Sequence, residues 1–223
     1  MLQGMDIKYA TSILPKLLDS LGFTLQMALT SYVLAVLGGV MIALIRFYKV
    51  KILDALFAMY ISFFRGTPLV AQLFLLYFGI SRYIPFLHKM TGYQAMIIGV
   101  SLNTAAYMAE GIRGALESVD KGQLEAARSI GMTKLQTSIR ILVPQAARVA
   151  VPTLSNNLID VIKGTALAIT IGVTDMMYVS QQMAAASFKF MECYIAVMLI
   201  YWIVSLVIGF LQNKLEVFLA RKY

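Results

Sequence analysis

Three long stretches without a charged residue constrain this chain more than any other feature. Residues 21–45, 91–109 and 193–213 contain no Asp, Glu, Lys or Arg. At about 1.5 Å of rise per residue, a helix of each length crosses or nearly crosses a hydrocarbon core about 30 Å thick. Only 13% of the residues are charged, whereas a soluble domain carries about 25%. The sequence therefore predicts an all-α integral membrane protein.

Two further apolar segments are interrupted by polar residues. Residues 52–80 contain Asp54 and the sequence RGTP at 65–68, and residues 149–174 contain DVIKG at 160–164. If each interrupted segment is one span, the chain has about five transmembrane helices, at roughly 20–45, 53–80, 91–116, 149–172 and 193–214. These helices form a single predicted domain over residues 1–223, with a polar loop at 118–148 between the third and fourth spans.

The distribution of positive charges predicts which side of the membrane each loop occupies. Eleven Lys and Arg residues lie in segments 46–51, 121–148 and 214–222, against five in segments 8–16 and 82–89 and at Lys189. Cytoplasmic loops usually carry the excess of Lys and Arg. We therefore expect a multi-pass protein with its N-terminus outside and its central loop and C-terminus in the cytoplasm.

Composition excludes several other classes of function. The net charge is +8, but no basic face interleaved with aromatic residues is present, so a nucleic-acid partner is not expected. One cysteine and one histidine exclude an internal disulfide, a cysteine-based metal site and a two-histidine metal centre. The chain contains no GxxxxGK[ST] motif, so we expect no ATP binding, no cofactor and no catalysis in this chain itself.

The central loop, ESVDKGQLEAARSIGMTKLQTSIRILVPQAAR at 117–148, reads as two short helices. Asp120 is a suitable N-cap for the first helix, and Gly131 suits the left-handed position that ends it. Thr133 and Gln136 have the spacing of a capping box that starts a second helix. Pro144 is expected to limit that second helix.

The first of these helices carries a narrow apolar stripe. Leu124, Ala127 and Ile130 recur at helical spacing, with Glu125 and Arg128 beside them. A short amphipathic helix buries such a stripe against the membrane surface, the protein's own loops or a partner protein. Spacing alone leaves these alternatives open.

Four motifs in order resemble one known family. The sequence EAA at 125–127, followed by Gly131 and Pro144, resembles the EAA loop of ATP-binding-cassette (ABC) importer permeases. FFRGTPLVAQLFLLYFGI (63–80), SLNTAAYMAEGIRGAL (101–116) and NNLIDVIKGTALA (156–168) resemble the polar amino acid branch of that family. The resemblance implies the transmembrane domain of a type I ABC importer, with five transmembrane helices and a cytoplasmic coupling helix. The coupling residues it implies are Leu124, Glu125, Ala126, Ala127, Arg128, Ile130 and Gly131.

The same resemblance implies the partners and the location of the protein. The coupling helix would dock in a groove of a separate ATPase dimer, which binds ATP and Mg²⁺. A binding protein would deliver the amino acid at the outer face of the bacterial inner membrane. Because five helices are too few to enclose a path, a second permease copy is expected, forming a homodimer or, with a close paralogue, a heterodimer.

The substrate is less clearly indicated than the class of transporter. The combination of RGTPLVAQLF, SLNTAAYMAE and VPQAARVAVPTLSNNLI resembles L-cystine permeases most, and basic amino acids or glutamine are the alternatives. A small secondary transporter or channel is the main rival class. Such proteins often contain inverted repeats, and no self-similarity between the halves is evident.

The interrupted spans hold the residues expected to contact substrate. Charges inside a bilayer are costly and usually line a cavity or pair with one another. Arg65 suits the carboxylate of an amino acid and Asp160 suits its ammonium group. The remaining candidates in these spans and in the third span are Gln72, Asn103, Tyr107, Asn156, Lys163 and Thr165.

Structural roles compete with substrate binding at most of these positions. Asp160 and Lys163 are three residues apart and can neutralise each other, as can Glu110 and Arg113. Arg65 can instead reach lipid phosphates or hold the break at residues 66–68 in shape. Asn103 and Tyr107 can serve as hydrogen-bonding groups between packed helices.

One stretch departs from the family pattern. Residues 162–167 read IKGTAL, where relatives usually read like LKDTSL, and Asp160 lies where a small polar residue is more common. A carboxylate has thus moved by about one helical turn. This shift puts a direct transfer of the family's substrate contacts in doubt and raises the possibility of a basic or amine-rich substrate.

Overall fold

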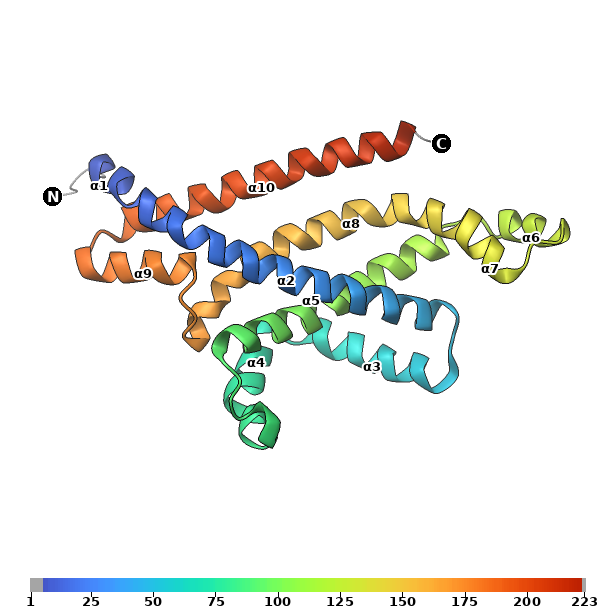
Figure 1. Ribbon diagram of the computed structural model, residues 1–223, viewed down its shortest axis with the longest axis horizontal. Helices are drawn as coiled ribbons and strands as arrows, with labels where there is room; N and C mark the ends of the chain where they lie inside the picture. The colour runs from blue at the N-terminus through green and yellow to red at the C-terminus, as the bar shows by residue number, and fades with distance from the viewer. Residues whose placement is uncertain (1–5, 222–223) are drawn as a thin grey trace. The chain divides into compact units, whose positions relative to one another are not determined.

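The computed structural model describes residues 6–221, and every regular element in that part of the chain is helical (Figure 1). Residues 1–5 and 222–223, which the predicted domain and the count of positive charges included, lie outside the described residues. The chain forms two compact units, one of Met1–Tyr32, Pro68–Val100 and Leu158–Ile208, the other of Val33–Thr67, Ser101–Asn157 and Gly209–Tyr223. We call them unit 1 and unit 2.

The helical elements follow one another with few long connections. In chain order they are α1 (Ile7–Ser12), α2 (Leu14–Phe47), α3 (Lys51–Gly66), α4 (Leu69–Phe74), the π-helical turn η1 (Leu75–Gly79), the 3₁₀ turns η2 (Ile80–Arg82) and η3 (Pro85–Leu87), α5 (Gly92–Glu117), α6 (Lys121–Ser129), α7 (Lys134–Thr137), the π-helical turn η4 (Ser138–Leu142), α8 (Val143–Gly164), the 3₁₀ segment η5 (Thr165–Ile171), α9 (Met176–Ser187) and α10 (Phe190–Arg221).

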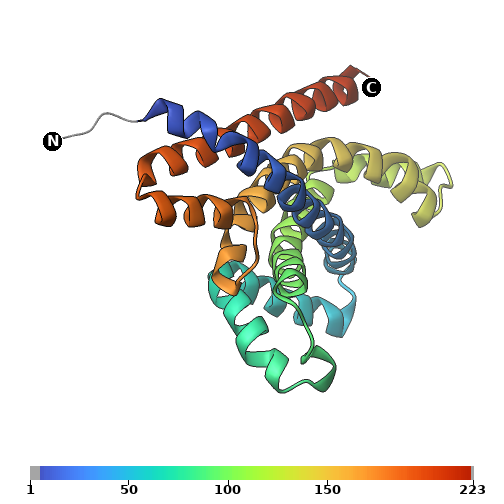
Figure 2. The ribbon, with the colours of Figure 1, turned by 60° about the vertical axis from the view of Figure 1, so that its left-hand side comes forward.

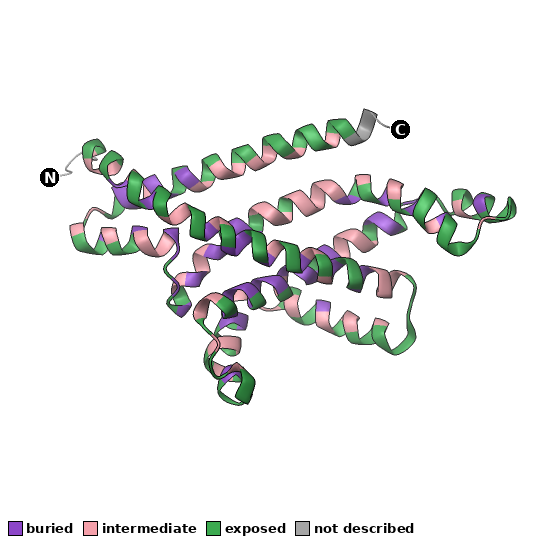
Figure 3. Cartoon of the chain, viewed as in Figure 1, coloured by how far each residue is buried: buried purple, intermediate pink, exposed green. Residues whose placement is uncertain are grey.

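Within residues 6–221, three helices are long and apolar enough to cross a membrane on their own. They are α2, α5 and the Phe190–Phe218 part of α10, and the number rises to five if each of two bent helix pairs forms one span. α2 begins before the first predicted span and α10 continues beyond the last. Large apolar residues along α10, including Trp202 and Phe210, are exposed (Figure 3), as expected for surfaces that face lipid or another subunit.

Unit 1 contains two apolar clusters. In the first, Met27 of α2, Leu73 of α4 and Met96 of α5 are all fully buried. The second joins the start of α2 to α9 and α10, and there the Ser180 hydroxyl of α9 donates a hydrogen bond to the Cys193 carbonyl oxygen of α10 at 3.1 Å. α1 lies beside the start of α10 (Figure 2). Apolar packing therefore fixes α9 within this unit.

Unit 2 packs the second half of α2 against α3, α5 and the first part of α8. A Cβ added to Gly39 of α2 would lie 2.7 Å from the Met108 Cβ of α5, and one added to Gly111 of α5 would lie 2.6 Å from the Thr153 methyl group of α8. Small residues let helix backbones approach closely where lipid provides no hydrophobic driving force. These two glycines therefore hold α2, α5 and α8 together in this unit.

Both interrupted segments contain a break in the helical path. α3 ends at Gly66, and Thr67 is extended at φ −123° and ψ 147° before Pro68, as expected for a residue that precedes proline. In the other segment, η5 ends at Gly172, which has φ +76°. A further helix, α9, then begins after Asp175 at a bend of 54°. The sequence analysis did not predict α9.

The expected role of Pro144 was wrong. The helical path runs through this residue, which is the second residue of α8. Proline lacks an N–H group, and its ring clashes with the carbonyl group four residues earlier in an α-helix. The π-helical turn η4 directly before α8 shifts hydrogen bonding from four residues back to five. This shift explains how the chain accommodates Pro144 without ending the helix.

Candidate functional site

Three side chains on one face of α5 hold the end of α3 at the first break, all within unit 2. Asn103 Nδ2 donates a hydrogen bond to the Phe64 carbonyl oxygen at 3.1 Å. The Arg65 guanidinium lies 5.5 Å from the centre of the Tyr107 ring. Glu110 Oε2 lies 3.5 Å from Arg65 Nη1. Because residues at i, i+4 and i+7 share a helix face, α5 fixes the turn that precedes residues 66–68.

Glu110 is also the centre of a charge cluster. Its carboxylate lies 3.1 Å from Arg46 of α2 and 3.2 Å from Arg113, in addition to Arg65. Arg46 pairs with Asp54 at 3.1 Å, and Arg113 pairs with Glu117 at 2.7 Å. Three positive and three negative side chains therefore balance one another and join α2, α3 and α5. The predicted Glu110–Arg113 pair is confirmed.

These contacts favour the structural interpretation of three predicted substrate ligands. Arg65, Asn103 and Tyr107 are all engaged at the end of α3. The side chain of Arg65 is 45% exposed, so another acceptor can reach it. These contacts indicate that the three residues hold the break after α3 in its shape. A direct contact with substrate remains a prediction.

A second polar set lies on α8. Asp160 Oδ1 and Lys163 Nζ are 2.8 Å apart, which confirms the predicted pair. Both side chains are more than half exposed, at 67% and 57%. Asn156, in the part of α8 that belongs to unit 2, is also exposed. An exposed pair of opposite charges, spaced by one helical turn, can bind the ammonium and carboxylate groups of a zwitterion.

The two remaining substrate candidates are buried in unit 1. Gln72 of α4 is 7% exposed. Thr165 is fully buried, and its hydroxyl donates a hydrogen bond to the Ile162 carbonyl oxygen at 2.7 Å. Neither side chain is placed with the exposed polar residues of α8. Thr165 therefore has a structural role, because its hydrogen bond stabilises the junction between α8 and the 3₁₀ segment η5.

Sequence reasoning missed a buried polar group at the start of α9. Asp175 is fully buried, and its Oδ1 accepts a hydrogen bond from the Tyr178 N–H group at 2.9 Å. Asp175 Oδ2 and the Tyr201 hydroxyl of α10 are both buried, and neither has a hydrogen-bond partner among the described residues. Met176 N donates to the Thr24 hydroxyl of α2 at 3.0 Å. The sequence GVTD at 172–175, a turn glycine followed by an N-cap residue, was the signal for this helix start.

The central loop has the predicted caps. Asp120 Oδ1 accepts from Gly122 N at 2.6 Å at the start of α6, and Gly131 after α6 has φ +88°. The Met132 N–H group bonds the Ala127 carbonyl oxygen at 3.1 Å, as in the motif that commonly closes a helix with a left-handed glycine. The predicted capping box of the second helix, α7, is also present.

The apolar stripe of α6 is divided between two environments, all within unit 2. Ala127 is buried and Leu124 packs against an apolar cluster formed by α5 and α8. Ile130, by contrast, is 80% exposed. The exposed side of α6 carries Glu125 and Arg128 (Figure 3). Part of the stripe therefore attaches α6 to its own chain, and the rest of the helix is free to contact a partner.

The loop is also held by two side-chain hydrogen bonds. Gln145 of α8 donates to Gln123 of α6 at 2.6 Å. The Tyr48 hydroxyl, after α2, lies 2.8 Å from the Ser138 hydroxyl of η4. Among residues 6–221, no group of three or more His, Cys, Asp or Glu side chains is placed to hold a metal ion.

Comparison with known proteins identifies the family. Residues 35–220 match the model of binding-protein-dependent transport system inner membrane components. A probable amino-acid ABC transporter permease protein, PatM of Vibrio harveyi, is 46% identical over 220 residues, which cover 99% of both chains. The L-cystine transport system permease protein TcyB of Bacillus subtilis is 35% identical, over 92% of this chain and 87% of TcyB.

A solved structure of an amino acid ABC transporter has the same fold as this chain. The crystal structure of an amino acid ABC transporter with histidines superposes with a TM-score of 0.87 at 30% sequence identity, over 96% of this chain and 99% of that one. The predicted type I ABC importer fold is thereby confirmed. The chain belongs to the binding-protein-dependent transport system inner membrane components, as the permease subunit of an amino-acid ABC transporter.

Proposed function

We propose that this subunit imports L-cystine across the bacterial inner membrane by alternating access. A binding protein delivers the amino acid at the outer face, where the N-terminus lies. A separate ATPase dimer binds ATP and Mg²⁺ on the cytoplasmic side, where the C-terminus and α6 lie. The observation that carries the proposal is α6 itself, a capped and anchored helix whose polar side is exposed.

The exposed surface of the central loop supports docking of an ATPase. Ile130, Leu135 and Ile139 are 80%, 69% and 60% exposed. Apolar side chains of this size on a loop that is otherwise polar are typical of a protein–protein contact. Leu124 packs against the apolar cluster of α5 and α8, and Gln145 bonds Gln123, so both contacts fix α6 to its own chain. A force on α6 is therefore passed to the start of α8.

The polar side of α8 supports a zwitterionic substrate. Asp160 and Lys163 together carry no net charge, so they suit an amino acid without net charge better than a basic one. A cavity of about 460 Å³ lies beside Lys163 in unit 1 and is lined mainly by apolar residues, among them Met177, Val197 and Tyr201. An unpaired carboxylate at Asp160 would favour a basic substrate. Because Lys163 pairs with Asp160, its charge is balanced and this argument no longer applies.

The assembly is part of the same proposal. Five spans do not enclose a path, and α10 exposes apolar side chains along most of its length. We therefore expect two permease subunits for each ATPase dimer. A homodimer is the simpler arrangement, and a heterodimer with a close paralogue would serve equally well.

Uptake of radiolabelled substrate tests this function. The chain, its ATPase and its binding protein are reconstituted in proteoliposomes, with ATP supplied on the ATPase side. We expect ATP-dependent cystine uptake that unlabelled cystine blocks and that arginine, lysine, histidine and glutamine do not. If the basic amino acids or glutamine block the uptake, the amino acid that blocks it is the substrate in place of cystine. Uptake driven by an ion gradient without ATP would contradict the transporter class.

Two substitutions locate the substrate in the same assay. Asp160→Asn and Lys163→Gln each remove one charge of the pair, so the cystine concentration at half-maximal uptake should rise about tenfold, the size of one charge-assisted hydrogen bond. Asp19→Asn is the matched control, because Asp19 is an exposed carboxylate of α2 outside the pair. Unchanged uptake in the first two variants would make the pair structural.

A further inference from the structure

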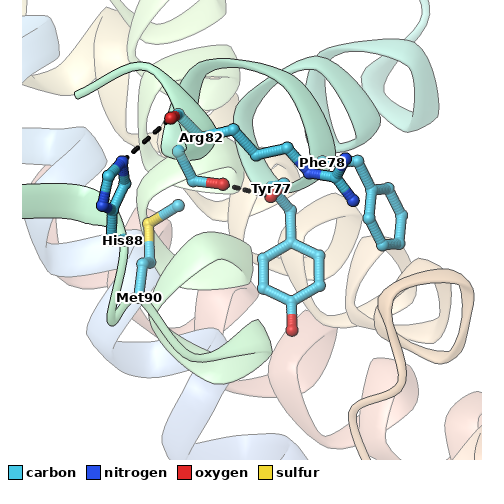
Figure 4. A pocket seen from close by; sticks show the side chains of 6 residues that line it. Tyr77, Phe78, Arg82, His88 and Met90 are labelled. Carbon is cyan, nitrogen blue, oxygen red and sulfur yellow. Dashed lines mark hydrogen bonds between the residues drawn. The ribbon is translucent and has the colours of Figure 1, made fainter. Parts of the chain in front are cut away.

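The connection between η1 and α5, residues 80–90, is a compact hairpin in unit 1. It contains the 3₁₀ turns η2 and η3, with Pro85 at the start of the second. His88 Nε2 donates a hydrogen bond to the Arg82 carbonyl oxygen at 2.9 Å and closes the hairpin (Figure 4). This bond holds the backbone of Arg82 next to His88.

A cavity of about 470 Å³ opens beside this hairpin. Its lining combines Arg82 and His88 with Tyr77, Phe78, Ser81 and Met90. In Figure 4 the Arg82 side chain extends toward the Phe78 ring, and Met90 lies near His88. The Ser81 hydroxyl is already used, because it donates to the Tyr77 carbonyl oxygen. The guanidinium group is thus the principal free donor, and it is flanked by apolar side chains.

The positive charge of the hairpin is not balanced by the chain. Residues 55–109 contain Arg65, Arg82 and Lys89 and no Asp or Glu. Arg65 has its partner in Glu110, but neither Arg82 nor Lys89 forms an ion pair with any residue between 6 and 221. A cavity lined by Arg82, with Lys89 in the adjoining groove, attracts an anion from outside the chain.

An apolar groove continues from the cavity along α5. It has a volume of about 410 Å³, shares Met90 with the cavity, and is lined also by Phe86, Lys89, Gln94, Ile97 and Ile98. Gln94, Ile97 and Ile98 lie three and four residues apart, so they form one face of α5. A charged cavity joined to an apolar groove matches a ligand with an anionic head and a hydrocarbon tail.

Exposed aromatic residues place the hairpin at the depth of lipid headgroups. Tyr83 is 86% exposed and Phe86 is 83% exposed. Aromatic side chains concentrate at the membrane–water interface, where the phosphate groups lie. Phosphates are present at this depth on both faces of a bilayer, so the argument holds for either orientation of the chain.

We propose that the hairpin binds an anionic phospholipid such as phosphatidylglycerol. The Arg82 guanidinium binds two phosphate oxygens through parallel N–H groups, a geometry that arginine favours with phosphate. Lys89 contributes a second positive charge near the headgroup. An acyl chain lies in the groove from Met90 to Ile97 and Ile98. An acidic protein surface would use the cations but would leave this groove empty.

Native mass spectrometry of the transporter, purified with its ATPase in mild detergent, tests the proposal. The complex is given equal amounts of phosphatidylglycerol and phosphatidylcholine. We expect preferential retention of phosphatidylglycerol, and Arg82→Gln should lower that preference about fivefold, as for the loss of one cation at an anionic membrane surface. Arg82→Lys should keep part of the preference, because it retains the charge and loses only the paired N–H groups.

Controls separate the lipid site from other sources of anion. Lys16→Gln removes an exposed cation of α2 that also forms no ion pair within residues 6–221, and it should leave lipid retention unchanged. Equal retention in wild type and Arg82→Gln would overturn the proposal. So would displacement of the lipid by millimolar inorganic phosphate, or an effect of Arg82→Gln confined to stimulation of the ATPase by the binding protein. If Arg82→Gln does not assemble, Lys89→Gln serves instead, with the same expected direction.

Discussion

At the scale of single residues, Glu110 shows what spacing reveals and what it does not. Its pair with Arg113 follows from their separation of three residues along α5, and the structure confirms it. Its contacts with Arg46 and Arg65 come from α2 and α3, and no local pattern indicates them. The same holds for Asn103, whose amide bonds a backbone oxygen 39 positions away. Local partners can therefore be predicted from sequence, and partners on other helices require the packed structure.

Removing the charge of Glu110 should destabilise the permease more than removing a peripheral charge. Glu110→Gln leaves three arginines around a neutral side chain that is only 25% exposed, a situation that costs several kcal/mol when fully buried and less here. We expect a fall of about 5 °C in the melting temperature of the detergent-solubilised complex, from roughly 2 kcal/mol at this chain length. Thermal unfolding followed by intrinsic fluorescence measures it.

Glu117→Gln is the matched control for this change. Glu117 is 51% exposed and contacts only Arg113 among the described ion pairs. An exposed pair contributes about 1 kcal/mol or less, so its melting temperature should fall by no more than about 3 °C. Equal losses in the two variants would mean that the three arginines around Glu110 do not act together.

At the scale of helical elements, caps were predictable and irregular turns were not. The ends of α6 and the start of α7 follow from Asp120, Gly131 and Thr133, whose side chains or backbone make local bonds. The path through Pro144 depends on η4, and a π-helical turn has no simple residue signature. The sequence analysis did not predict α9 because the apolar segment before it continues almost to the start of this helix. Asp175 was the available signal.

Substitution of Gly131 tests whether α6 is the coupling element. A Cβ at Gly131 would meet open space, but φ of +88° is strained for other residues. Gly131→Asn tolerates this conformation and should keep most uptake. Gly131→Arg adds bulk and charge beside α6, so uptake should fall more than about tenfold while ATP hydrolysis continues. The assay compares both rates in proteoliposomes, and normal cystine uptake by Gly131→Arg would contradict docking at α6.

The attachment of α1 should depend on pH. The Lys189 ammonium donates a hydrogen bond to Asp6 at 2.6 Å and holds the pKa of that carboxyl below its usual value of 3.8. A lowered carboxyl pKa means that the pair stabilises α1 above pH 3.8 and that this stabilisation is lost as the pH falls further. Asp6→Asn should therefore free α1 even at pH 7.

Spin-label mobility measures this attachment. A label at Thr11→Cys is suitable because Thr11 is exposed and the native Cys193 is buried. The spectrum should show an immobile label at pH 7 and a mobile one only after the pH has fallen through the lowered pKa of Asp6, which lies under 3.8, with Asp6→Asn mobile throughout. Asp19→Asn should behave as wild type. An immobile label in Asp6→Asn at pH 7 would show that apolar contacts alone hold α1.

At the scale of the whole molecule, the apolar stretches and the ordered motifs predicted the class of fold and the family. Both follow from properties that act along the chain, namely hydrophobic length and residue spacing. The roles of the candidate substrate residues could not be predicted in the same way, because the structure separates them into two groups. Asp160 and Lys163 remain together on an exposed helix face, whereas Arg65, Asn103 and Tyr107 are occupied at the end of α3. Function within an interrupted span therefore depends on contacts that hydropathy does not encode.

The π-helical turn η4 sets a rotational phase between the central loop and α8. An α-helix advances about 100° per residue, and a π turn holds one residue more than an α turn. Deleting one residue from Ser138–Leu142 would let this turn close as an ordinary α turn, so α8 would keep nearly the same rotational phase relative to α7. A related permease that lacks this one residue would therefore present the same face of α8 and keep the same coupling loop, with a regular α turn in place of η4.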